Sequence, residues 1–134
     1  TAFAVDSTSA VSRDTPGRMM STGYLYYCAS ILSEMAALTG RDEDRARYRE
    51  LAERTAEAFD RTYWNEEAGG YAANNQAANS FALFLGLVGE DRIDRVVENL
   101  ADDVAAHDYH LTTGNLCTKY LMEMLTRYGH AETA

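Results

Sequence analysis

The fold of this protein is decided by residues 76–88, which read QAANSFALFLGLV. The stretch is apolar nearly all round and contains no proline, so we expect a helix that is buried on most of its sides. The next stretch, residues 90–106, has a single apolar stripe, and acidic residues and arginines fill the remaining positions. That pattern is typical of a helix with one face in water. A buried helix followed by a half-buried one predicts an inner and an outer layer.

The same contrast repeats along the chain. Residues 21–39 and 115–128 also carry apolar residues around most of the helix, whereas residues 42–63 form an amphipathic helix. Ser21 or Thr22 is the expected N-cap of the first helix, and Gly40 and Gly89 are the expected stops of the first and third. Between the second and third helices, the residues around 66–69 predict a small hairpin or an irregular turn.

The order of the helices is therefore buried, amphipathic, buried, amphipathic, buried. A tetratricopeptide-like solenoid would instead place two similarly amphipathic helices in each repeat. The strict alternation favours an inner ring shielded by an outer ring. The sequence thus predicts an all-α protein in which stacked helical hairpins form part of an (α/α)6 barrel.

Composition excludes several functional classes. The chain has 134 residues, of which 46% are hydrophobic, and its net charge is −9. Such a charge repels the phosphate backbone, so nucleic acid is not expected as a partner. We expect no membrane span, because no apolar run approaches about twenty residues. No signal peptide is visible, which favours a cytoplasmic over a secreted protein. Cys28 and Cys117 both lie in apolar helical patterns, and we expect two small buried thiols.

The titratable residues do not predict a catalytic or metal site. Glu66 and Glu67 are adjacent in a turn, so their side chains should point apart and into water. Asp102 and Asp103 lie on the polar side of the fourth helix. Residues 107–110, which include two histidines, could be read as metal ligands, but a convincing third partner for zinc is missing. No glycine-rich phosphate loop is present, and we expect no cofactor.

Two polar segments precede the third and fifth helices and are the candidate binding residues. Amides and hydroxyls at helix N-termini could bind sugar hydroxyls, and a nearby aromatic ring could stack on a sugar. Simple N-capping would explain the same residues and is the simpler interpretation. The candidates for lining a carbohydrate-binding cavity are Tyr71, Asn75, Gln76, Asn79, His110, Thr113 and Asn115.

An ordered set of short motifs resembles the catalytic domain of bacterial α-L-rhamnosidases. The motifs are STGY at residues 21–24, MAALTG at 35–40, NQAAN at 75–79 and HLTTG at 110–114. The resemblance covers residues 14–134, and residues 1–13 look like a variable connecting loop. It implies a segment of a six-hairpin glycosidase whose partner is a carbohydrate, a terminal L-rhamnoside. Such enzymes hydrolyse the glycosidic bond with inversion, through an acid and a water-activating base, without a redox cofactor.

The sequence departs from the family pattern at four points. Asn115 stands where the family has an aromatic residue, and Cys117-Thr118 stand where it has a Gly-Thr pair. The family's acid lies in an upstream Asp-Glu-Arg…Gly-Trp-Thr-Gly-Asp segment and its base in a downstream Thr-Thr-x-Trp-Glu segment, and this sequence contains neither. We therefore assign no catalytic residue, and we expect the chain to be inactive by itself and to derive from a longer sequence.

Two other functions fit the same pattern. The chain could be a helical-repeat module that binds protein on a concave face, or part of a six-hairpin glycosidase that acts on another sugar such as a glucoside. An open arc of helices should also leave apolar flanks uncovered. We expect these at Tyr24 and Ile31 and at Leu121 and Leu125, and they predict self-association into a homo-oligomer.

Overall fold

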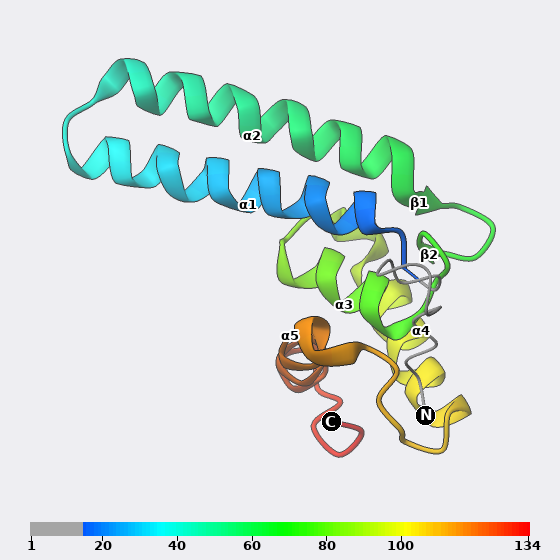
Figure 1. Cartoon of the computed structure of the whole chain (residues 1–134). Coiled ribbons are helices and arrows are strands. Elements are labelled where there is room, and N and C mark those ends of the chain that lie inside the picture. Colours follow the sequence, from blue (N-terminus) through cyan, green and yellow to red (C-terminus); the bar gives the residue numbers. More distant parts are fainter. Residues whose placement is uncertain (1–14) are drawn as a thin grey trace, which may run out of the picture.

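The computed structural model describes residues 15–134, so the predicted variable loop at residues 1–13 lies outside the described residues. Helices dominate this part of the chain, and a short β-hairpin interrupts them (Figure 1). The elements are α1 (Gly17–Leu38), α2 (Asp42–Tyr63), β1 (Trp64–Asn65), β2 (Gly70–Tyr71), α3 (Gln76–Phe84), the 3-10 helix η1 (Glu90–Arg92), α4 (Ile93–Ala106) and α5 (Gly114–Arg127).

The start of α1 differs from the prediction. The helix begins directly after Pro16, whose carbonyl accepts a hydrogen bond from the Met19 amide at 2.9 Å. Ser21 and Thr22 are not N-caps, because their hydroxyls donate to carbonyls one turn earlier, at 3.0 and 2.8 Å. Proline suits a helix start, since its fixed φ is already close to the helical value. The predicted end at Gly40 is confirmed: its φ is +68°, which an L side chain rarely adopts.

The third helix is the centre of the core but is shorter than predicted. Eight of its nine residues, all except Phe84, are buried. It ends at Phe84 and not at Val88, because Gly86 turns the chain with a φ of +67°. The Leu87 amide then donates back to the Ala82 carbonyl at 3.1 Å, which closes the helix end. Gly86, and not Gly89, is therefore the stop.

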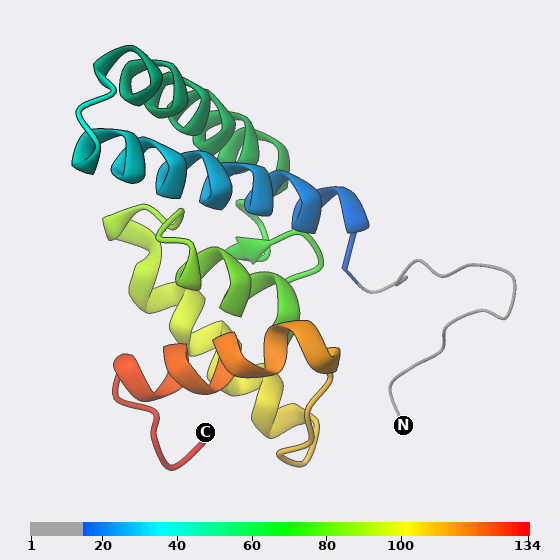
Figure 2. The same cartoon turned by 60° about the vertical axis from the view of Figure 1, so that its left-hand side comes forward.

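The helices form the two predicted layers. In Figure 2, α1, α3 and α5 lie one below the other with their N-terminal ends on the same side, and α2 and α4 lie behind them. Helix α3 packs against α1, α4 and α5, and α1 packs along α2. Gly23 permits the close approach of α1 to α3, since a Cβ there would collide with the Phe81 ring of α3. The prediction of stacked helical hairpins with an inner and an outer layer is confirmed.

The amphipathic helices have the predicted buried stripes. In α2, Ala52, Thr55 and Phe59 are buried, and in α4 the buried residues are Val96, Val97, Leu100 and Val104. The predicted hairpin is also present, with Trp64 paired to Tyr71 and Asn65 to Gly70 in antiparallel register. None of the helices within residues 15–134 combines the length and apolarity that crossing a membrane requires.

One predicted apolar flank is exposed and the other is not. Ile31 is 38% exposed and Tyr24 is half-buried, as a flank requires, but Leu121 and Leu125 are 1% and 0% exposed. The prediction of an exposed second flank was wrong, because these leucines of α5 belong to the common core. Cys117 is buried as predicted, whereas Cys28 is exposed, which contradicts the prediction of two buried thiols.

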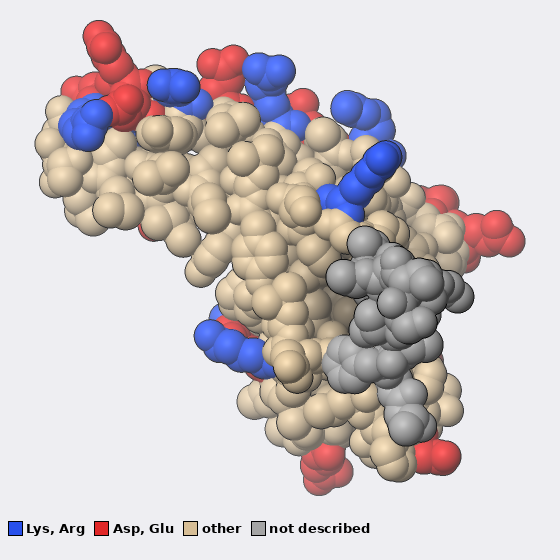
Figure 3. Space-filling model, viewed as in Figure 1, with Lys and Arg blue, Asp and Glu red and all other residues tan. Residues whose placement is uncertain are grey.

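Helix α1 instead exposes apolar residues along much of its length. Figure 3 shows charged residues gathered over α2, while the side of α1 seen there is nearly free of charge. The exposed large apolar residues of α1 are Leu25, Tyr27, Ile31, Leu32, Met35 and Leu38. A sequence that is apolar all round does not show which side of the helix will be covered.

Candidate functional site

Hydrogen bonds made by polar side chains join the N-terminal ends of the inner helices. Thr15, next to the start of α1, donates from its hydroxyl to Asn75 Oδ1 at 3.2 Å. Gln76, the first residue of α3, bonds to the segment that precedes α5. We call that segment, residues 107–113, the α4–α5 loop. The structure therefore brings together the two polar segments that the sequence singled out.

Asn75 is the N-cap of α3. Its Oδ1 accepts a hydrogen bond from the Ala78 amide at 2.9 Å, in the geometry of a conventional N-cap. The same oxygen accepts the Thr15 hydroxyl, and the residue is half-buried. The N-capping interpretation is thus confirmed for Asn75, while its contact with a sugar stays a prediction.

Gln76 is completely buried and uses both ends of its amide. Nε2 donates to the His110 carbonyl at 3.2 Å, and Oε1 accepts from the Thr112 amide at 2.9 Å. Buried polar groups need such partners, because an unsatisfied one keeps the full cost of leaving water. Gln76 therefore fastens the α4–α5 loop to α3 and does not face solvent.

His110 lies on the exposed side of this loop. Its Nδ1 is 2.9 Å from the Asp108 carbonyl and 3.1 Å from the His107 carbonyl. Among residues 15–134, the non-glycine residues with positive φ are Ala72 and Asn74 before α3, and Asp108 and Tyr109 before α5. Backbone strain of this kind concentrates at functional sites.

Thr113 and Asn115 flank the start of α5. Thr113 is 8% exposed, and its hydroxyl is 2.8 Å from that of Thr118, which donates to the Gly114 carbonyl at 2.7 Å. Thr118 has one hydroxyl hydrogen, so Thr113 is the donor between the two hydroxyls. Asn115 is exposed in the first turn of α5. Of this pair, Asn115 is the residue that a ligand can reach.

Tyr71 and Asn79 lie inside the protein. Both are 0% exposed, and Asn79 Oδ1 accepts from the Tyr71 amide at 2.9 Å. The Tyr71 hydroxyl is 2.8 Å from Asp60 Oδ1 and 3.1 Å from the Leu87 carbonyl. Burial raises the pKa of Tyr71, and the hydrogen bond to Asp60 raises it further. With no exposed ring face, Tyr71 fits a structural role better than stacking on a sugar.

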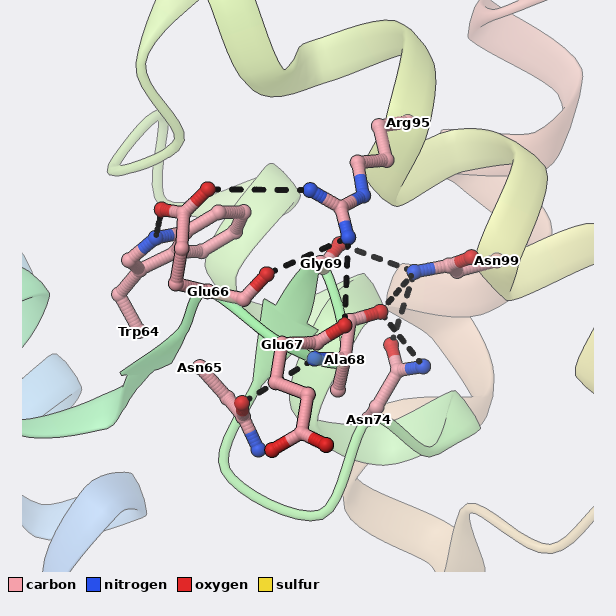
Figure 4. Close-up of polar contacts among 9 residues, drawn as sticks. All are labelled: Trp64, Asn65, Glu66, Glu67, Ala68, Gly69, Asn74, Arg95 and Asn99. Carbon is pink, nitrogen blue, oxygen red and sulfur yellow. Dashed lines mark hydrogen bonds and ion pairs between the residues drawn. The ribbon is translucent and has the colours of Figure 1, made fainter.

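A second polar cluster, which was not predicted from the sequence, holds the β1–β2 turn against α4 (Figure 4). Asn99 Nδ2 lies 3.0 Å from the Ala68 carbonyl, 2.9 Å from the Gly69 carbonyl and 3.2 Å from Asn74 Oδ1. Asn74 Oδ1 in turn accepts from Asn79 Nδ2 at 2.7 Å. The cluster therefore connects the turn, α4 and the start of α3.

Glu66 belongs to this turn and takes part in binding it to α4. Its carboxylate accepts from Trp64 Nε1 at 2.7 Å and lies 3.9 Å from Arg95 Nη1, and its side chain is 81% exposed. Arg95 and Asn99 are four residues apart, so they share one face of α4. The spacing of these two polar side chains on one helix face is the feature of the sequence from which the cluster could have been predicted. Within residues 15–134, no group of three His, Cys, Asp or Glu residues could hold a metal ion.

The sequence matches a family model along almost its whole length. The model is that of the bacterial alpha-L-rhamnosidase 6 hairpin glycosidase domain, and it matches residues 3–134. This chain belongs to that family. An alpha-L-rhamnosidase of Streptomyces avermitilis is 32% identical over 124 residues, which are 92% of this chain and 12% of that protein.

Solved structures of the family have the same arrangement of helices. The alpha-L-rhamnosidase from Dictyoglumus thermophilum matches with a TM-score of 0.83 and 36% identity, over 90% of this chain and 14% of that one. The Streptomyces avermitilis alpha-L-rhamnosidase complexed with L-rhamnose matches with a TM-score of 0.82 and 31% identity, over 92% and 12%. The predicted family and the six-hairpin glycosidase fold are confirmed, and this chain spans between 12% and 14% of the length of these relatives.

Proposed function

We propose that this segment forms part of the substrate-binding wall of an enzyme that hydrolyses terminal L-rhamnosides. The observation that carries the proposal is the set of hydrogen bonds that joins the N-terminal ends of α1, α3 and α5 into one polar surface. Support also comes from family membership, and from the relative whose structure was solved as a complex with L-rhamnose.

The residues of this surface divide into two groups. Asn75, His110 and Asn115 are half-buried or exposed, and their amide and imidazole groups can bond sugar hydroxyls. The buried group holds the surface in shape and consists of Tyr71, Gln76, Asn79 and Thr113. This division assigns to three of the seven candidates the contacts with a carbohydrate.

Catalysis requires groups beyond this surface. Inverting hydrolysis needs a general acid and a base about 6.5–9.5 Å apart, with a water molecule between the base and the sugar. The accessible polar residues of the surface are two amides and one imidazole, which do not supply that pair of carboxylates. We therefore propose that other segments contribute the acid and the base, and that this chain alone binds without turnover.

A sugar titration tests this function directly. We expect L-rhamnose to shift the NMR signals of Asn75, His110 and Asn115, and we expect no release of nitrophenol from an aryl α-L-rhamnoside. Replacement of the accessible imidazole, His110→Ala, should weaken binding. Thr126→Ala is the matched control, since Thr126 is exposed at the opposite end of α5.

Each alternative has its own outcome in this experiment. Larger shifts with glucose than with L-rhamnose would favour a six-hairpin glycosidase of another specificity. The absence of shifts with either sugar would contradict the carbohydrate-binding surface and leave the helical-repeat interaction module as the better proposal. Turnover that a substitution in this chain abolishes would overturn the claim that catalytic groups come from elsewhere.

A further inference from the structure

The amide of Gln76 connects parts of the chain that are far apart in sequence. Its bond to the His110 carbonyl spans 34 residues, and its bond from the Thr112 amide spans 36. The two contacts lie on either side of Leu111, which is itself 46% exposed. The buried side chain of Gln76 therefore holds both ends of residues 110–112. The backbone of these residues cannot rotate without breaking one of the two hydrogen bonds.

The residues just before this stretch need such support. Asp108 and Tyr109 have φ values of +52° and +59°, so two successive non-glycine residues have a strained backbone conformation. Strained residues persist only where their surroundings hold them in place. On one side the end of α4 does so, since the Tyr109 amide donates to the Val104 carbonyl at 2.9 Å. On the other side the support comes from Gln76.

The fixed loop also determines how His110 presents its ring. Both neighbours of Nδ1 are carbonyl oxygens, of His107 and Asp108, and a carbonyl oxygen can only accept. Nδ1 must therefore carry the hydrogen, which leaves Nε2 of the neutral ring with a free lone pair. Because His110 is exposed, that lone pair can accept a hydrogen bond from outside the chain.

We propose that Gln76 is a positioning residue that fixes the α4–α5 loop so that His110 Nε2 accepts a hydrogen bond from a sugar hydroxyl. The sugar contact rests on the proposed function, whereas the positioning of the loop does not. A polyhydroxylated ligand suits this arrangement, because each hydroxyl can donate to a neutral imidazole nitrogen.

The experiment compares two buried amides of the same helix. Asn79 is also 0% exposed, but its bonds go to Tyr71 and Asn74 and not to the loop. In Gln76→Leu, we expect the Thr112 amide to exchange with deuterium roughly tenfold faster, since it loses one ordinary hydrogen bond. The ring nitrogen signals of His110 should change from the Nδ1–H form to a mixture of tautomers. Asn79→Leu should destabilise the fold and leave both signals unchanged.

Three results would overturn the positioning role. The first is that Gln76→Leu leaves both the exchange rate of the Thr112 amide and the ring nitrogen signals of His110 unchanged. The second is that Asn79→Leu changes these two readouts as much as Gln76→Leu does. The third needs no variant: a His110 ring found in the Nε2–H form in the unmodified chain. It keeps the proposal testable if a variant fails to fold.

L-rhamnose is the probe for the sugar contact. We expect it to shift the His110 Nε2 signal in the unmodified chain and to shift it less in Gln76→Leu. If the loop responds to Gln76→Leu but L-rhamnose leaves Nε2 unchanged, the positioning role holds and the sugar contact of the proposed function is wrong. The two claims can therefore fail separately.

Discussion

At the scale of single residues, burial decides what each side chain does. Tyr71 and Asn79 were candidates for sugar contact because they are polar or aromatic and lie near a helix start. Both are 0% exposed, and their polar groups are bonded within the chain. The same holds for Gln76, whereas His110 is exposed. Residue type identified this region, but exposure separates its supporting residues from those that can bind a ligand.

Tyr71 should make the protein sensitive to alkali. Its pKa is raised above the ordinary value of 10.0, first by burial and then by its bond to Asp60. The unfolded chain releases this proton near pH 10 and the folded chain at higher pH, so the group's contribution to stability is lost as the pH rises above 10. Tyr24 has a raised pKa as well, chiefly through burial, and adds to the effect.

Tyr71→Phe should therefore flatten the fall of the unfolding free energy above pH 10, as measured by urea titration at several pH values. At neutral pH it should cost about 1–2 kcal/mol, since it removes a hydrogen bond to a carboxylate. Tyr109→Phe is the control, because Tyr109 is 67% exposed. An alkaline slope that Tyr71→Phe leaves unchanged would contradict this prediction.

The two cysteines should differ in reactivity. Cys117 is 2% exposed, and burial raises its pKa to about 11, so little of the reactive thiolate forms at pH 8. Cys28 is exposed on α1. We expect a thiol reagent such as DTNB to label one group rapidly in the folded chain and two in urea. Cys28→Ser should abolish the rapid phase, and a rapid phase that survives this substitution would show that Cys117 is accessible.

At the scale of elements, long polar side chains hold the irregular segments against the helices. Asn99 and Arg95 of α4 bind the β1–β2 turn, and Gln76 of α3 binds the α4–α5 loop. No residue of the turn at 66–69 or of the α4–α5 loop belongs to the hydrophobic core or to the apolar residues packed against it, so side-chain hydrogen bonds help to set the positions of both segments. In both cases a helix that belongs to the core carries the polar group.

Asn99→Ala should release the β1–β2 turn. Three oxygens within 3.2 Å of Asn99 Nδ2 would lose this donor, and we expect a loss of about 1–2 kcal/mol in the urea unfolding free energy. Hydrogen exchange should rise at the Gly69 amide, which donates to the Asn65 carbonyl at 2.8 Å. Asn115→Ala is the matched control, because it replaces an exposed asparagine. Equal stability of the two variants would show that the cluster in Figure 4 contributes little.

At the scale of the whole molecule, the inner layer is covered unevenly. Helix α3 has neighbours on several sides, whereas α1 exposes a series of large apolar residues. Contiguous apolar surface of this kind is uncommon on soluble monomers. The prediction of self-association therefore rests on α1 alone, since the proposed flank on α5 is buried.

Self-association can be measured by light scattering after size-exclusion chromatography at micromolar concentration. We expect a mass above 14.9 kDa that falls towards this value on dilution. The substitutions Leu32→Glu and Met35→Glu, which place charges on residues 41% and 55% exposed, should reduce association. Leu116→Glu on α5 is the control, because Leu116 is 54% exposed outside α1. A single monomeric species in the unmodified chain would contradict the prediction.

Family, helix order and most helix ends could be predicted from the sequence. The bounds of α2, Asp42–Tyr63, are those predicted, because its apolar period and acid-rich start are local features. The start of α1 at Gly17 was missed although Pro16 is a local signal, since the polar residues Ser21 and Thr22 looked like caps. The stop at Gly86 was missed for a similar reason, because Gly89 follows the last apolar residue.

By itself, the sequence determined which segments are helical, their order and the alternation of inner and outer layers. These features depend on hydrogen bonds and apolar periods among residues close together in the chain. Only the tertiary structure decided that Gln76 binds residues 34 and 36 positions away, that Leu121 is buried and that Cys28 is exposed. A helix that is apolar all round can be covered on any side, so the neighbour that packs against it decides which side chains are buried.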